Sequence, residues 1–173
     1  MIQDSQHKYA ITLIALKEYD AALSTLQNVL HSSRKKYGYQ HEKVAVLLNN
    51  IACCHYWLGG HLSASKTFEE AIEILKESKH RHLEAGEMIK ISVLLGRCLK
   101  NLGFVRSKRS DCSEAIVALE EVLTLTRRVY GKGHPFVTDC LDQLSYVMAN
   151  ANCQNNKKSV DFVSKQYSEM LLN

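Results

Sequence analysis

This 173-residue sequence has one proline and eight glycines, and neither clusters with serine. The absence of such clusters argues against long flexible linkers and low-complexity segments. No uncharged apolar run approaches the roughly 18–20 residues that span a bilayer, so we expect no membrane insertion. The first residues lack a basic start followed by an apolar core, so we also expect no signal peptide. With 46% hydrophobic residues, the chain can bury a continuous core within one domain.

The six cysteines lack the spacing of a metal site or of a disulfide framework. No CxxC pair occurs, and Cys53 and Cys54 are adjacent. That spacing suits neither a zinc knuckle nor a regular disulfide pattern. Reduced, mostly buried thiols are the simplest interpretation, and they indicate a reducing compartment. We therefore expect a cytoplasmic protein.

Signatures of catalysis are also scarce. Serines are common, but no nucleophile elbow and no phosphate-binding glycine loop accompanies them. His80 and His82 form the only tight histidine pair, and their spacing puts the rings on different faces of a helix. We expect a protein that is not an enzyme and that needs no metal or cofactor.

Acidic residues are missing from one stretch of the chain, between Met88 and Ser110. The basic residues of this stretch are Lys90, Arg97, Lys100, Arg106, Lys108 and Arg109. It therefore carries +6, and because the whole chain carries +4, the other residues sum to −2. Such a stretch favours an acidic partner. Its other interpretation is RNA or other nucleic-acid binding through segment 90–109, with phosphate contacts from Arg106, Lys108 and Arg109.

Helical periodicity dominates the rest of the sequence. Apolar residues recur at i, i+4, i+7 and i+8, which is one face of a helix. Three such sets occur: Ala22, Leu26, Val29 and Leu30; Ala64, Phe68, Ala71 and Ile72; and Ala115, Leu119, Val122 and Leu123. Each set is preceded by a predicted partner helix. The first is the N-terminal segment around Tyr9, Ile11 and Leu13, the second runs from Val44 to the glycine stop at Gly59, and the third copies it from Met88 to Gly103. A fourth such helix begins at Pro135, and a closing helix that carries Val160, Val163, Tyr167 and Met170 follows it.

The block Tyr37–Val44 recurs as Tyr130–Val137, and both copies read Tyr-Gly-x-x-His-x-x-Val. A repeated helical unit cannot bury its apolar face alone, so such units must stack on one another. Two regular 42-residue units would separate the blocks by 84 residues, but the gap from 37 to 130 is 93. Seven of the nine extra residues fall between Gly103 and Ala115. They either lengthen both helices or form a protruding loop.

The stretch Leu48-Asn49-Asn50-Ile51-Ala52, followed by Gly59, Ala64 and Phe68, resembles a tetratricopeptide repeat (TPR). The unit length and the Gly-x-x-His linker resemble the kinesin light chain subtype of that repeat. This resemblance implies an all-α fold, a right-handed α-solenoid of about four helical hairpins. We expect a single domain over 1–173, with repeats at about 1–36, 41–80, 84–130 and 134–172.

In the family that this chain resembles, the first helix of each hairpin lines a concave groove that holds an extended peptide. The resemblance thus implies a protein-interaction scaffold whose partner is a protein or peptide. Because the groove is basic, we expect an acidic peptide; nucleic acid is the less favoured partner. The expected peptide-binding residues are Asn49, Asn50, Tyr56, Trp57, Lys90, Arg97, Lys100 and Gln143. Two of them have an alternative role: Asn50 as a solvated helix residue, and Trp57 as packing between hairpins.

Overall fold

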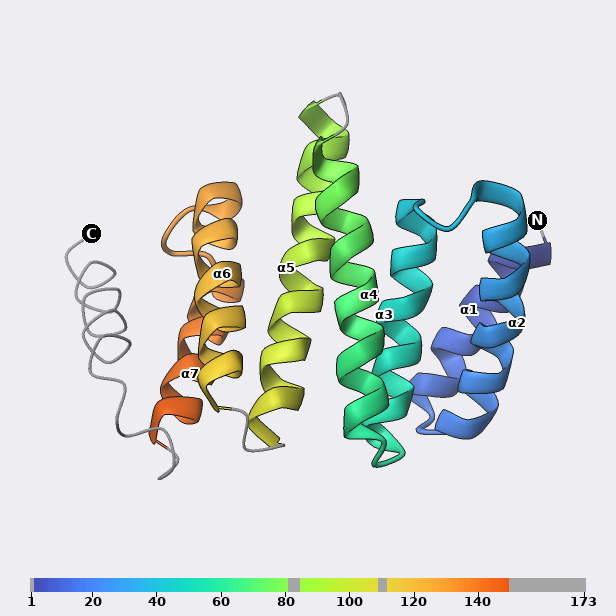
Figure 1. Cartoon of the computed structure of the whole chain (residues 1–173), viewed down its shortest axis with the longest axis horizontal. Coiled ribbons are helices and arrows are strands. Elements are labelled where there is room, and N and C mark those ends of the chain that lie inside the picture. The colour runs from blue at the N-terminus through green and yellow to red at the C-terminus, as the bar shows by residue number, and fades with distance from the viewer. Residues whose placement is uncertain (1, 81–84, 109–111, 150–173) are drawn as a thin grey trace. The chain divides into compact units, whose positions relative to one another are not determined.

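The structure is a computed structural model that describes residues 2–80, 85–108 and 112–149 (Figure 1). Every element in these ranges is an α-helix, which confirms the predicted all-α helical repeat fold. The helices are α1 (Ile2–Ala15), α2 (Tyr19–Tyr37), α3 (Glu42–Trp57), α4 (His61–His80), α5 (Ala85–Lys108), α6 (Cys112–Tyr130) and α7 (Pro135–Ala149). None of the helices described is long and apolar enough to cross a membrane. The predicted closing helix after Asn150 lies outside the described residues.

The chain divides into two compact units, Met1–Leu94 and Leu95–Asn173, called unit 1 and unit 2 below. In unit 1, α1 packs against α2 and α3 against α4, while α2 also packs against α3 (Figure 1). The predicted apolar stripes supply this core, because Ala22, Leu26, Ala64 and Phe68 are all buried. Alanine opens each stripe, which lets the helices approach closely. In unit 2, α6 packs against α7 through equally buried apolar residues.

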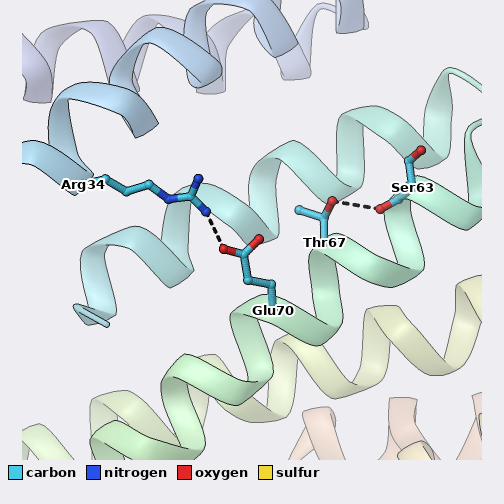
Figure 2. A network of polar contacts seen from close by, with 4 residues as sticks. All are labelled: Arg34, Ser63, Thr67 and Glu70. Atoms are coloured by element: carbon cyan, nitrogen blue, oxygen red, sulfur yellow. Dashed lines mark hydrogen bonds and ion pairs between the residues drawn. The ribbon is translucent and has the colours of Figure 1, made fainter. Parts of the chain in front are cut away.

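An ion pair joins the two hairpins of unit 1. Figure 2 shows the Arg34 guanidinium of α2 paired with the Glu70 carboxylate of α4. In the same helix as Glu70, the Thr67 hydroxyl donates to the Ser63 carbonyl oxygen at 2.8 Å. Both members of the ion pair are partly exposed, so we expect it to contribute well under 1 kcal/mol. Its consequence is that Arg34 already has an anionic partner.

The recurring Tyr-Gly-x-x-His block ends one helix and starts the next. Gly38 and Gly131 take φ values of 87° and 83°, a backbone region that favours glycine. Three residues after each glycine, a histidine side chain caps the following helix. The Nδ1 atom of His41 accepts from the Lys43 N–H at 3.1 Å, and that of His134 accepts from the Phe136 N–H at 3.2 Å. The block that revealed the repeat is therefore a local folding motif.

The turns inside the first two hairpins share one geometry. The N–H of Glu18 donates to Leu13 O and that of Gly60 to His55 O, the bond of a Schellman helix end. The left-handed residue of this motif is Lys17 in the first turn, with φ 63°, and Gly59 in the second, with φ 82°. These positions, 17 and 59, are one 42-residue unit apart. A lysine therefore occupies a place that glycine fits better.

Helix α5 differs from the sequence expectation at its C-terminal end. It has 24 residues against 16 in α3 and continues through Gly103, where a glycine stop was predicted. Leu102 and Val105 are both buried, so apolar packing on each side of Gly103 holds the helix together there. Part of the predicted insertion therefore lengthens a helix. Arg106 and Lys108 lie on α5 instead of in a turn, and Arg109 lies outside the described residues.

Candidate functional site

A chain of polar contacts links the first helices of the two hairpins in unit 1. The Asn49 amide donates to Asn50 Oδ1 at 3.3 Å, and the Asn50 amide contacts His7 Nε2 at 3.1 Å. An amide nitrogen can only donate, so the Nε2 atom of His7 accepts and the ring carries its proton on Nδ1. Burial lowers the pKa of His7, against a smaller opposing effect of Asp4, and so favours this neutral ring.

Of the two adjacent asparagines, only Asn50 is partly exposed. Asn49 is only 5% exposed to solvent. Its buried amide orients the Asn50 side chain through the hydrogen bond to Asn50 Oδ1. Asn50 uses one amide hydrogen on His7 and one oxygen lone pair on Asn49. An amide offers two donors and two acceptors, so one of each remains for a further partner.

Trp57 is 60% exposed at the end of α3, close to two other aromatic rings. Its indole stacks on Tyr19 of α2, with centroids 5.7 Å apart and planes 8° apart. Tyr56 meets the same indole edge-on at 5.2 Å. The stack joins two hairpins, which is the packing role considered for Trp57, yet more than half of the residue faces solvent. A held but exposed tryptophan is a suitable binding anchor.

The predicted cationic residues have different surroundings. Lys90, in unit 1, and Arg97, in unit 2, are both exposed. Lys100, in unit 2, forms an ion pair with Asp139 of α7, and its ammonium lies 5.1 Å from the centre of the Phe136 ring. Gln143, also on α7, is half-buried, and its Oε1 atom is buried without a hydrogen-bond partner. Lys100 is thus already neutralised within the fold.

A cavity of about 160 Å³ lies between α1, α2 and α3, and sequence reasoning did not predict it. It is lined by Asp4, His7, Val29, Ser33, Tyr37, Lys43, Val46 and Leu47. The Nζ atoms of Lys36 and Lys43 lie 4.8 and 4.7 Å from the centre of the Tyr37 ring. The signal in the sequence was Lys35-Lys36-Tyr37 followed by Lys43. That signal was hidden because Tyr37 and Lys43 belong to the recurring block, which was interpreted only as evidence of a repeat.

The thiols are placed for packing. Cys53, Cys54, Cys98 and Cys140 form no disulfide, and all but Cys53 are buried. Burial raises the pKa of Cys54 to about 11 and that of Cys140 to about 12. Such thiols stay protonated and unreactive at neutral pH. Across the part of the chain that the structure describes, no group of three or more His, Cys, Asp or Glu residues could hold a metal ion.

Comparison with known proteins identifies repeats in both units. One model of the tetratricopeptide repeat family matches residues 2–77, and a second matches residues 95–136. No curated protein matches the chain.

Several solved structures are similar in fold. BtubC (BKLC) from P. vanneervenii is 20% identical with a TM-score of 0.74, covering 97% of this chain and 64% of that one. The chain thus spans less than two thirds of that protein's length. A Podosopora anserina structure of nearly identical TPR-like repeats, named for kinesin light chain, is 13% identical with a TM-score of 0.42. It covers 97% of this chain and 94% of that one. The TPR2AB-domain:pHSP90 complex of yeast Sti1 is 13% identical with a TM-score of 0.37. The match covers 96% of this chain and 85% of that one.

Proposed function

On the premise that this chain belongs to the tetratricopeptide repeat family, we propose that it is an adaptor that binds an extended, acidic peptide. Repeats of this family generally mediate protein–protein interaction and are typically non-catalytic scaffolds. The proposed binding surface is the face formed by the first helices of the hairpins. We further propose one domain of four such hairpins over 1–173, in the cytoplasm. That Cys53, Cys54, Cys98 and Cys140 form no disulfide supports that compartment.

The observation that carries this proposal is the hydrogen bonding of Asn50. Its contact with His7 fixes the amide between α1 and α3, and its contact with Asn49 fixes which way the amide faces. The remaining donor and acceptor match the carbonyl and N–H of one residue in an extended peptide. Because the amide is already oriented, a peptide need not order it on binding, which lowers the cost of association.

Charge and apolar contact support an acidic ligand with an apolar anchor point. Lys90 and Arg97 are exposed cations, whereas Lys100 is offset by Asp139. We therefore assign carboxylate recognition to the first two, and the apolar anchor contact to Trp57, with Tyr56 holding its ring. Gln143 is kept in the proposed set because it lies on α7, the first helix of its hairpin, although its Oε1 atom is buried.

The nucleic-acid alternative has less support. Its basic patch comprised Arg106, Lys108 and Arg109, and the first two lie along α5 instead of projecting from a loop. With Lys100 offset by Asp139, the charge available to phosphates is smaller than the sequence indicated. The nearby aromatic residue, Phe104, is half-buried, so its ring offers little exposed surface on which a base could stack.

A pair of matched double variants tests the peptide-binding face. Asn50→Ala with Lys90→Glu changes the first helices, and Asn28→Ala with Lys66→Glu makes the same changes at exposed sites on α2 and α4. Proteins that the immobilised wild type captures from a lysate would be quantified by mass spectrometry. We expect the first variant to lose them and the second to keep them. Unchanged capture by the first variant would place the binding surface elsewhere, and tight single-stranded RNA binding at ~0.2 M salt would favour the nucleic-acid alternative.

A further inference from the structure

Tyr37, the last residue of α2, is surrounded by basic groups. The ammonium groups of Lys36 and Lys43 approach its ring, and the His41 ring lies 4.8 Å from it. Hydrogen bonding to Lys36 is the main cause that lowers the pKa of the Tyr37 phenol, and Lys43 adds to it. Both ammonium groups therefore lie beside the same phenol ring. Two like charges beside one ring repel each other, and an anion between them would relieve that repulsion.

Nearby acidic groups offset this charge only in part. Asp4 lines the same cavity and acts on Lys36, but it is one carboxylate against two ammonium groups. The Glu42 carboxylate lies 3.1 Å from His41 Nδ1, on the linker side. Arg34 adds no charge to the cavity, because it is paired with Glu70 on α4 (Figure 2). Lys43 in the cavity wall and Lys36 beside it thus stand against one lining carboxylate, Asp4.

The cavity beside Tyr37 is large enough for a small polar group and is rich in hydrogen-bond donors. Its volume of about 160 Å³ exceeds several-fold the ~30 Å³ that one water molecule occupies in the liquid. Ser33 contributes a hydroxyl to its wall, and His7 contributes a ring that carries its proton on Nδ1. Val29, Val46 and Leu47 supply apolar walls, while Lys36 and Lys43 are exposed to solvent.

We propose that this cavity binds an oxyanion, a carboxylate or phosphate group held by Lys36, Lys43 and the Tyr37 hydroxyl. Lysine binds such groups as a compact charge, and charge-assisted hydrogen bonds are about twice as strong as neutral ones. The site adjoins the peptide-binding face proposed for Asn50, because His7 both lines the cavity and contacts the Asn50 amide, but its ligand-holding groups differ from Asn50, Lys90 and Arg97. It uses the helix-linking block for recognition, in addition to that block's role in ending and starting helices.

The test uses the full chain and sodium phosphate, titrated at constant ionic strength and followed by NMR amide shifts of Ser33, Tyr37 and Lys43. We expect saturable shifts in the wild type and at least fivefold weaker binding in Lys36→Ala with Lys43→Ala. Tyr37→Phe keeps the ring and removes one donor, so it should weaken binding about threefold to tenfold. Lys35→Ala with Lys66→Ala removes the same charge from exposed sites and should leave binding within twofold. Equal loss in this control, or no saturable shift in the wild type, would overturn the proposal.

A second arm identifies the source of the oxyanion. A fluorescein-labelled octapeptide of alternating glutamate and glycine is titrated by anisotropy, with phosphate as competitor. Peptide binding that phosphate displaces, and that Lys36→Ala with Lys43→Ala abolishes, supports a peptide side chain as the source. Phosphate shifts without peptide binding support a free anion. Peptide binding that ignores phosphate, together with absent phosphate shifts, rejects this site while leaving the Asn50 surface intact.

Discussion

Replacing Lys17 with glycine should stabilise the protein, although the substitution removes a side chain and adds none. Lys17 holds the left-handed position of the Schellman turn between α1 and α2, with φ 63°. Its side chain is exposed, so little packing is lost when it is removed. The equivalent residue one unit later is Gly59, with φ 82°.

The magnitude follows from two opposing backbone effects. A left-handed backbone costs a residue with a Cβ atom roughly 1–2 kcal/mol, while glycine's extra freedom in the unfolded chain costs roughly 0.5–1 kcal/mol. For Lys17→Gly these leave a net stabilisation of about 0.5–1 kcal/mol, equivalent to about 1–4 °C in Tm for a chain of this length. Gly59→Lys should destabilise by a similar amount, because a Cβ there meets no atom within 4 Å and only the backbone opposes it.

Urea unfolding followed by circular dichroism at 222 nm measures both changes. Lys66→Gly is the matched control, because Lys66 is exposed in the middle of α4 and glycine there should destabilise by about 0.5–1 kcal/mol. The same substitution is thus expected to have opposite signs at positions 17 and 66. If Lys17→Gly destabilises the protein as Lys66→Gly does, the left-handed strain assigned to Lys17 is wrong.

Three further predictions concern the linker, the half-buried histidine His7 and the thiols. His41→Ala should cost about 1 kcal/mol in urea unfolding because the Lys43 N–H loses its cap, whereas His41→Asn, which can still cap, should cost less than half as much; equal losses would assign the effect to the ring contact with Tyr37. Because burial lowers the pKa of His7 below 6.5, the unfolded chain takes up its proton first, so stability should fall as pH drops below about 6.5. His7→Gln should flatten part of that slope between pH 7 and 5, and an unchanged slope would exclude His7 as its source. Peptide mapping after alkylation at pH 7.5 should find Cys54 and Cys140 protected relative to half-exposed Cys53 until the protein unfolds, and equal labelling would contradict their burial.

The helices were predictable from sequence because their apolar residues repeat with the period of a helix. The predicted stripe from Ala22 to Leu30 is buried along its length, and Pro135 begins α7 as expected. Gly103 misled the prediction because a glycine stop is a local signal, whereas helix continuation there depends on tertiary packing of Leu102 and Val105. Local propensity is a weak guide where burial on both sides favours the helix.

The candidate site was predictable only in part. Family resemblance singled out Asn49 and Asn50 together, but neighbouring helical residues differ by about 100° in direction, so one is buried while the other is partly exposed. The contact from Asn50 to His7 crosses 43 positions in sequence and depends on how two hairpins pack. The convergence of Lys36 and Lys43 on Tyr37 depends in turn on the path of the linker after Gly38. Periodicity specifies helix faces, but it contains no information on these distances.

Photo-crosslinking from one first-helix position and one second-helix position tests the central claim most directly. Ile11 lies four residues after His7, on the same face of α1, and is 47% exposed. Val117 is 63% exposed on α6, a second helix. Each would be replaced in turn by p-benzoylphenylalanine, and the proteins crosslinked in a lysate would be identified by mass spectrometry. The account predicts specific partners crosslinked from position 11 and background only from position 117. Partners crosslinked from position 117 alone would contradict binding through the first helices.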